Sequence, residues 1–444
     1  MDASSPRSPA RRLRRRRRAR TLFATAVVAP LLLAGAAGCT GPAPLGPSSP
    51  PSSPGSPDQS TPERSESESE QVADLTGIVE EAMATLDLKA VIVEVQVGDQ
   101  ILMTEAFGES MTGVDATTDM HFRNGAVAFS YVSNLLLQYV DDGTVSLDDT
   151  IDQWTPELPE SDTVTLRMLT NQTTGYPDFE TDPGWTAAYN ENPFHEFTYE
   201  ERIEYAFNRP LQFEPGTNWS YSHTNFMILG HILSQIGGEP LDVLLAEKVL
   251  EPMGLDETEG YNSSFIPEPV LHAFSSERRV ALDLDPSTPF YEESTFWNPV
   301  WGTPVGGAET TTISDMTTTA IAIGTGELLS DESFHEMTDS QLIGFGERLP
   351  ECEPSCFTQV DGYNYGLGVV RSGAWMLQNP QLSGYSAVEA YLPSDEIAIS
   401  VATTYAPGAF EPDGRYDNSA DRVFRMIGTY LAPGEPPPPL PPKQ

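Results

Sequence analysis

Two stretches of alternating apolar and polar residues lie near opposite ends of this chain of 444 residues. Residues 89–108, KAVIVEVQVGDQILMTEAFG, alternate on either side of Gly98, and residues 385–406, YSAVEAYLPSDEIAISVATTYA, alternate on either side of Pro393. Each pattern predicts two antiparallel strands joined by a short turn. Strands from both ends that meet in one sheet would leave the residues between them as an insertion.

Much of that insertion has helical periodicity. A helix is predicted because Ala128, Val132, Leu135, Leu136, Tyr139 and Val140 fall on one apolar stripe at helical spacing. The segment Asp141-Asp142-Gly143 is predicted to end it, since glycine suits the left-handed cap. From Thr150 to about Ser264 the chain is predicted to be helical and rich in loops, and a last helix follows Asn418, which is suited to cap it. The sequence therefore predicts one α+β unit, an antiparallel sheet flanked by terminal helices with a mostly helical insertion.

The first 38 residues have the layout of a secretory signal. A basic run, RRLRRRRRAR, precedes an apolar stretch that is too short for an ordinary membrane span. Small residues at 36–38 directly before Cys39 resemble the site where bacterial lipoprotein signals are cut and the cysteine is lipidated. We therefore expect removal of residues 1–38 and attachment through Cys39 to the outer face of the cytoplasmic membrane, in a bacterium of Gram-positive type. A cut elsewhere, or a basic run that binds nucleic acid, is the disfavoured alternative.

Two segments lack the residues needed to build a core. Residues 39–73 are rich in Pro, Ser and Glu, and residues 433–444 read PGEPPPPLPPKQ. Such compositions bury too little apolar surface to become ordered, so a disordered tether and a stiff tail are predicted. The folded domain is accordingly expected to span residues 74–432.

Charge and cysteine content exclude several kinds of partner. The formal net charge of −41 at pH 7 opposes binding to nucleic acid and to anionic lipid headgroups. Apart from Cys39, the chain has only Cys352 and Cys356, whose spacing around a Pro-Ser turn predicts a small disulfide loop in an oxidising compartment. No further Cys or His lies near them, so no metal site and no cofactor are predicted.

Several stretches carry a more specific pattern: FRNGAVAF with VSLDD, VTLRMLTNQTTGYPDF, LQFEPGTNWSYSHTNFMILGHIL, LLAEKVLEPMGLDET, GGAETTTISDM, YGLGVV and SGYSAVEAYLPSDEIAIS. Together, over about residues 76–430, they resemble the penicillin-recognising serine hydrolases, which include class C β-lactamases, D-alanyl-D-alanine carboxypeptidases and related esterases. The resemblance implies the β-lactamase/transpeptidase-like fold. It also implies a cleft in which a serine attacks the substrate and a lysine three residues later takes or relays its proton.

Neither of these two catalytic residues is present. The family pattern Phe-Arg-x-Gly-Ser-x-x-Lys aligns with FRNGAVAF, where Ala126 stands at the serine position and Phe129 at the lysine position. The lysines of the whole chain are Lys89, Lys248 and Lys443. Each has a leucine three positions before it, so a Ser-x-x-Lys pair does not occur anywhere in the sequence.

The two other family motifs are altered to different degrees. The second, normally Tyr-x-Asn, reads Tyr221-Ser222-His223, and its outer residues can still donate hydrogen bonds. The third, usually Lys or His followed by x-Gly, aligns by counting with Gln378, Asn379 and Pro380. The cation that would bind a substrate carboxylate is missing, and the proline removes a hydrogen bond between strands.

Three functional hypotheses follow. The first is a non-catalytic lipoprotein whose Tyr221, His223 and Phe129 bind a cell-wall peptide, an envelope protein or a small apolar ligand. The second is an active β-lactamase, carboxypeptidase or esterase with a relocated nucleophile, such as Ser130 or Ser222 acting with His223. The third is a scaffold that acts through its tether or tail. Tyr221 and His223 are equally well interpreted as a partly buried polar pair that satisfies its hydrogen bonds within the protein and binds no ligand.

Overall fold

The computed structural model describes residues 66–261, 263–299, 302–307, 309–339 and 342–439. The chain divides into two units, residues 1–62 and 63–444, and the described residues belong to the second. The signal segment, Cys39 and most of the predicted tether lie outside the described residues. Within them, no helix is both long enough and apolar enough to cross a bilayer.

The described helices are α1 (Glu66–Thr85), α2 (Val127–Asp141), α3 (Leu166–Thr170), α4 (Pro183–Glu191), α5 (Tyr199–Phe207), α6 (His223–Gly237), α7 (Leu241–Leu245), α8 (Ile313–Thr325), α9 (Asp331–Thr338) and α10 (Ser419–Leu431). The long strands are β1 (Leu88–Val97), β2 (Gln100–Met111), β13 (Tyr385–Leu392) and β14 (Ile397–Tyr405). The short strands are β3 (Val114–Asp115), β4 (Phe122–Arg123), β5 (Glu259–Gly260), β6 (Phe274–Ser275), β7 (Glu292–Glu293), β8 (Glu309–Thr311), β9 (Asn364–Tyr365), β10 (Val370–Ser372), β11 (Trp375–Gln378) and β12 (Gln381–Leu382). Short helical turns are η1 (Ile151–Gln153), η2 (Phe179–Thr181), η3 (Ala246–Leu250), η4 (Glu277–Arg279) and η6 (Pro407–Ala409).

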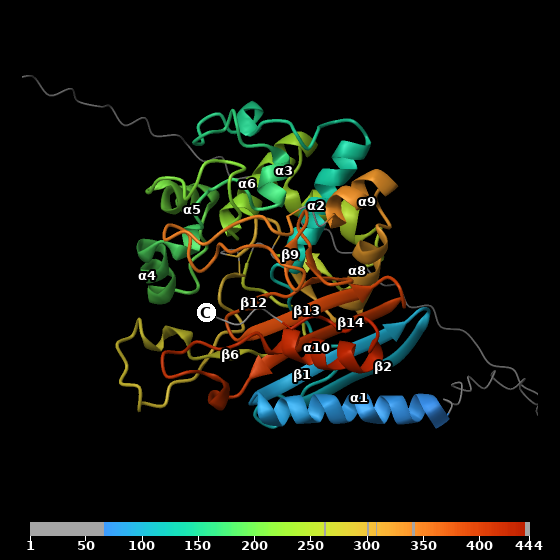
Figure 1. Ribbon diagram of the computed structural model, residues 1–444. Helices are drawn as coiled ribbons and strands as arrows, with labels where there is room; N and C mark the ends of the chain where they lie inside the picture. The colour runs from blue at the N-terminus through green and yellow to red at the C-terminus, as the bar shows by residue number, and fades with distance from the viewer. Residues whose placement is uncertain (1–65, 262, 300–301, 308, 340–341, 440–444) are drawn as a thin grey trace, which may run out of the picture. The chain divides into compact units, whose positions relative to one another are not determined.

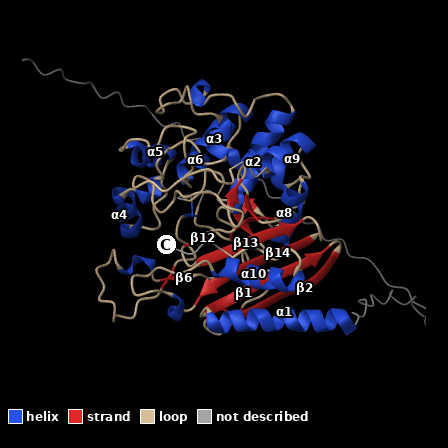
Figure 2. Cartoon of the chain, in the orientation of Figure 1, coloured by secondary structure: helices blue, strands red, loops and turns tan. Residues whose placement is uncertain are grey.

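The two predicted hairpins form the centre of one antiparallel sheet with the order β3-β2-β1-β14-β13-β11-β10-β9 (Figures 1 and 2). Strand β1 from the beginning of the domain pairs with β14 from its end, and Val93 lies opposite Val401. This pairing brings the two ends of the domain together, so the insertion leaves from β2 and returns through β9. The predicted α+β fold with a helical insertion is confirmed.

Helices cover both faces of the sheet because the side chains of each strand alternate. Val388 and Ala390 of β13 belong to the large core that includes residues of α1 and α10. Ala387 directly precedes Val388 on the same strand and belongs to a second core with Ile313 and Met316 of α8. Figure 1 shows α10 in front of the strands and α1 along the lower side of the sheet.

The predicted helix ending near Gly143 is α2, and it is buried on nearly all sides. It begins after Gly125, whose φ of +54° favours glycine over other residues. A Cβ atom at this position would also lie 2.7 Å from Cβ of Pro380, which is closer than carbon atoms can pack. Gly125 therefore permits the start of α2 to approach the chain between β11 and β12.

The domain is longer at both ends than the sequence predicted. Helix α1 begins at Glu66, ahead of the predicted boundary at 74, and its residues Leu75 and Val79 are fully buried. The prediction treated residues 66–73 as tether because they lack apolar side chains, although glutamates near a helix N-terminus are favoured by the helix dipole. The tail is also partly packed, since Pro437 is buried and Trp375 donates a hydrogen bond to the carbonyl of Glu435 at 2.9 Å.

Candidate functional site

A cavity of about 260 Å³ lies where α2 and α6 begin and where the sheet is interrupted between β11 and β12. Its walls are formed by Arg123, Gly125, Ala126, Tyr221, His223, Pro299, Gly302, Thr303, Glu309, Tyr363, Gln378, Asn379, Pro380, Gln381 and Leu382. These residues include parts of all three motifs identified in the sequence. The tertiary structure therefore brings the three altered motifs to one cavity.

Ala126 lies at the floor of this cavity, as the residue directly before α2. Its methyl group occupies the position expected for a nucleophilic hydroxyl. Among the described residues that line the cavity, none is a serine or a lysine. Lys89 and Lys248 lie instead over the rings of Phe274 and Tyr139, at 5.5 and 5.7 Å from the ring centroids.

Phe129 is fully buried and is not among the residues that line the cavity, so its ring could reach a ligand there only if it moved. Its side chain is fully buried and stacks on Phe226 of α6, with ring centroids 4.0 Å apart and planes inclined by 4°. The sequence alone left open whether this ring fills the cleft or lines it. An aromatic ring gains more by packing against α6, so it closes the space behind Tyr221 and His223, whose rings lie 6.2 and 6.1 Å away.

The serines considered as relocated nucleophiles lie outside the cavity wall. Ser130 is fully buried on α2 and donates a hydrogen bond to the carbonyl of Val127 at 2.7 Å. Ser222 is fully buried as well, with its side chain turned away from the cavity lined by its neighbours Tyr221 and His223. Both hydroxyls would have to move to reach a substrate.

The second motif is held in the cavity wall by two carboxylates, one from Asp178 directly before η2 and one from Glu180 within it. Nδ1 of His223, the first residue of α6, lies 2.9 Å from Oδ2 of Asp178 and 3.1 Å from Oε1 of Glu180. The rings of Tyr221 and His223 meet edge to face, with centroids 5.0 Å apart. The sequence analysis did not identify Asp178 and Glu180, although the acidic run in YPDFETD was a signal that could have drawn attention to them.

Burial shapes the ionisation of these groups. Burial raises the pKa of Glu180 to about 8, although the charge of His223 opposes this rise, and Asp178 adds a smaller increase. For His223, burial alone would lower the pKa, but the charges of Glu180 and Asp178 outweigh it and raise the pKa to about 9. Burial also raises the pKa of Tyr221 well above its ordinary value, so this phenol stays protonated at neutral pH.

The third motif lies in the opposite wall, where the counted alignment placed it. Gln378 ends β11 and donates a hydrogen bond to the carbonyl of Gly368 at 2.6 Å, while Asn379 donates to Asp421 at 3.1 Å. Pro380 stands in the break between β11 and β12, both of which pair with β13. Where the family has a cation, this wall has the side-chain amides of Gln378 and Asn379, and both already donate hydrogen bonds within the protein.

Two ionisable residues in the cavity wall, Glu309 and Arg123, were not among the residues expected from the sequence. Glu309 of β8 is 1% exposed, and burial raises its pKa to about 8 although Asn124 donates a hydrogen bond to it at 3.2 Å. Arg123 of β4 is 3% exposed, and burial lowers its pKa to about 10, so it remains a cation at neutral pH. A glutamate within the small-residue run GGAETTT was the available signal for the first of them.

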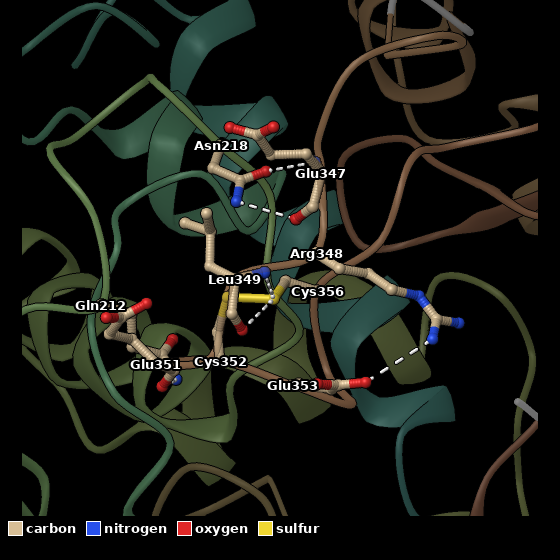
Figure 3. Close-up of a disulfide and its surroundings, with 9 residues drawn as sticks. All are labelled: Gln212, Asn218, Glu347, Arg348, Leu349, Glu351, Cys352, Glu353 and Cys356. Atoms are coloured by element: carbon tan, nitrogen blue, oxygen red, sulfur yellow. Dashed lines mark hydrogen bonds and ion pairs between the residues drawn. A yellow bond between two sulfur atoms is a disulfide. The ribbon is translucent and has the colours of Figure 1, made fainter.

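The predicted disulfide is present (Figure 3), and its loop contacts the backbone of the second motif. Cys352 and Cys356 are bonded with an S–S distance of 2.09 Å. The carbonyl of Ser355, within this loop, accepts a hydrogen bond from the backbone N–H of Tyr221 at 3.2 Å. Asn218 exchanges two further hydrogen bonds with the backbone of Glu347, at 2.8 and 3.0 Å.

The fold and the position of the cavity define a serine hydrolase scaffold of the type that the sequence resembles. The Beta-lactamase family model matches residues 75–423, and the chain belongs to this family. Penicillin-binding protein 4* of Bacillus subtilis is 27% identical over 179 residues, which cover 39% of each chain. A putative D-alanyl-D-alanine carboxypeptidase of Escherichia coli K12 is 27% identical over 203 residues, which cover 42% of this chain and 44% of that protein. The matches thus span less than half the length of these curated relatives.

Solved structures share the fold over most of the domain. The D-amino acid amidase from Ochrobactrum anthropi SV3, solved with D-phenylalanine, has a TM-score of 0.66 at 21% identity and covers 81% of this chain and 98% of its own. A penicillin-binding protein from Bacillus halodurans has a TM-score of 0.61 at 16% identity and covers 79% and 99%. These likenesses confirm the β-lactamase/transpeptidase-like fold.

Proposed function

We propose that this chain is a non-catalytic member of the β-lactamase family that binds a ligand in the cavity between the three altered motifs. The observation that carries the proposal is the pair Ala126 and Phe129. The first has no nucleophilic atom, and the second has no proton-accepting group and packs into the core. Loss of the nucleophile in enzymes of this kind costs on the order of 10⁴-fold or more in turnover.

The cavity supports binding because its polar groups are already held in place. Tyr221 and His223 are supported by the disulfide loop and by the Asp178–Glu180 segment, and Gln378 and Asn379 are anchored in the opposite wall. Groups that are fixed before binding lose little entropy when a ligand arrives. Because curated relatives are named as D-alanyl-D-alanine carboxypeptidases, we favour a cell-wall peptide that ends in D-alanine as the ligand.

The proposal includes export and attachment to the outer face of the cytoplasmic membrane through Cys39. The basic run, the short apolar stretch and the small residues before Cys39 support it. A Cys39→Ala variant should move from the membrane fraction to the soluble fraction of the producing bacterium. An unchanged membrane fraction would count against the lipid anchor.

Covalent labelling tests the absence of catalysis. The purified protein is incubated with a fluorescent penicillin and, separately, with a fluorophosphonate, and its intact mass is measured beside an active penicillin-binding protein. We expect a labelled control and an unmodified chain. An adduct mapped to Ser130, Ser222 or another side chain would overturn the proposal and identify a relocated nucleophile.

Ligand binding is tested with a matched pair of peptides, one ending in D-Ala-D-Ala and the other in L-Ala-L-Ala. Calorimetry should detect binding of the first, and Tyr221→Ala should weaken that binding by at least about tenfold because the ring forms part of the wall. His231→Ala is the control, since His231 is exposed and stacks on Tyr199 outside this cavity. Equal binding of both peptides, or of neither, would refute this ligand.

A further inference from the structure

We propose that Asp178, Glu180 and His223 form a binding site for one divalent transition-metal ion at the edge of the cavity. One atom from each residue is available as a ligand, namely Oδ2, Oε1 and Nδ1, and these atoms lie within 4.8 Å of one another. Ligand atoms at about 2.1 Å from a metal ion and at right angles to one another are about 3 Å apart. The distances of 2.9 and 3.1 Å from Nδ1 to the two carboxylate oxygens match this spacing.

A proton on His223 cannot satisfy the whole cluster. Nδ1 carries at most one hydrogen, and the hydrogen bond from it goes to Asp178. Oε1 of Glu180 is left without a hydrogen-bond donor and is shut off from solvent. A buried oxygen without a hydrogen-bond partner is costly, whereas an ion that displaces the protons held by Glu180 and His223 would satisfy all three atoms together.

The three residues are fixed by neighbouring hydrogen bonds, as the ligands of metal sites usually are. The backbone N–H of Glu180 donates to Oδ1 of Asp178 at 3.1 Å, which orients that carboxylate. The hydroxyl of Thr224 donates to the carbonyl of Pro177 at 2.7 Å and accepts from the backbone N–H of Phe179 at 3.2 Å. These bonds tie the loop that carries both carboxylates to the first turn of α6, where His223 lies.

The donor set indicates the class of ion. Two carboxylate oxygens and one imidazole nitrogen suit Zn²⁺, Mn²⁺, Fe²⁺ or Co²⁺, whereas Ca²⁺ prefers six or more oxygen ligands. His223 lines the cavity, so remaining coordination positions can face the space where a ligand would bind. In the described part of the chain, no second group of His, Cys, Asp and Glu gathers three ligand atoms in this way.

Positive charges nearby limit the affinity that we expect. The guanidinium of Arg202 interacts electrostatically with both Glu180 and His223, and His223 occupies the positive N-terminal end of α6. We therefore expect dissociation constants in the micromolar range rather than the tighter values of structural zinc sites. Metal binding does not require the proposed peptide ligand and is measured without it.

The test titrates the intact exported chain, freed of metal by a chelator, with Zn²⁺, Mn²⁺ and Co²⁺ separately in a calorimeter. We expect one ion per chain for at least one of these metals, together with a visible absorption spectrum of bound Co²⁺. Glu180→Gln and His223→Asn should each weaken binding by at least about tenfold. His272→Asn is the matched control, because His272 forms a pair with the single carboxylate of Glu293 at 2.6 Å and should leave binding unchanged.

Two results would overturn the proposal. The first is the absence of stoichiometric binding of all three metals to the folded wild-type chain, which needs no variant to interpret. The second is binding that Glu180→Gln and His223→Asn leave unaltered, which would place the ion elsewhere. If either variant fails to fold, anomalous scattering from a zinc-soaked crystal of the wild type decides whether the ion lies beside His223.

Discussion

At the scale of single residues, Phe129 shows how the position that aligns with the family lysine is used in this chain. A lysine at this position would need a polar environment, whereas the phenylalanine is fully buried and stacks on Phe226. The ring thereby joins α2 to α6 directly behind the second motif. A position that aligns with a catalytic lysine in the family here contributes an apolar ring to the packing behind the cavity wall.

Phe129→Ala should lower the free energy of unfolding by about 3–5 kcal/mol, because it leaves a hole in a closely packed core. Chemical denaturation monitored by circular dichroism measures the loss. Phe265→Ala is the control, since that ring is 54% exposed and its removal should change stability by no more than about 0.5 kcal/mol. Similar losses in both variants would contradict the structural role assigned to Phe129.

Glu309 should make the stability of the protein fall as pH rises. Burial raises its pKa to about 8 in the folded state from 4.5, so folding favours the protonated carboxyl group. The contribution is complete below pH 4.5 and is lost as pH rises through about 8. Glu309→Gln keeps the shape of the side chain but removes its ionisable group. The melting temperature of this variant should therefore fall less than that of the wild type between pH 5 and pH 9. Glu327→Gln, an exposed control, should follow the wild type.

At the scale of elements, the start of α10 joins the last helix to the third-motif wall. Asn418 caps α10 by accepting a hydrogen bond from the backbone N–H of Asp421 at 3.0 Å. Its amide also donates to the carbonyl of Asn379 at 2.7 Å. One side chain therefore fixes both the helix terminus and the interrupted strand that lines the cavity.

Asn418→Ala should cost about 1–2 kcal/mol in unfolding free energy, because it removes a helix cap and a second hydrogen bond. Ser222→Ala is the matched variant. Ser222 precedes α6 in the same capping position, but its side chain makes no capping bond and its buried hydroxyl has no partner. We expect it to be neutral or slightly stabilising in the same denaturation experiment. Equal losses of unfolding free energy in the two variants would show that the capping bond of Asn418 does not contribute to stability.

The disulfide loop should matter more for the local order of Tyr221 than for global stability. Cys352 and Cys356 are four residues apart, and closing so short a loop stabilises a protein by roughly 2 kcal/mol or less. Replacing both cysteines with serine should speed hydrogen exchange at the amide of Tyr221, which donates to Ser355 in the loop. Adding a reducing agent to this double variant should have no further effect. An unchanged exchange rate at this amide would show that the disulfide loop does not order Tyr221.

At the scale of the whole molecule, the formal net charge of −41 is the dominant electrostatic feature. Carboxylates that repel one another across the surface destabilise the compact state, and dissolved salt screens that repulsion. The melting temperature should therefore rise between low salt and about 1 M NaCl, where the screening length is about 3 Å. KCl should act in the same way, whereas a decrease with both salts would contradict the argument.

Much of the architecture could be predicted from sequence because it depends on local periodicity. The two hairpins, the buried stripe of α2 and the Asn418 cap follow from residue spacing and capping chemistry. Helix α1 begins ahead of the predicted boundary at residue 74, and part of the predicted tail packs on the domain, for a related reason. The start of α1 and the packed part of the tail are stabilised by contacts with distant residues, which a composition of Glu, Ser and Pro does not reveal.

The sequence by itself determined that Ala126 and Phe129 occupy the aligned positions of the family serine and lysine, because no Ser-x-x-Lys pair occurs anywhere in the chain. Only the tertiary structure decided where the replacements lie, with Ala126 in the cavity and Phe129 in the core. It also brought Asp178 and Glu180 to His223, since loops and helix termini that are distant in sequence meet only through the packing of α2, α6 and the sheet. Burial and proximity set the pKa values and the proposed metal site, and both are properties of the folded chain.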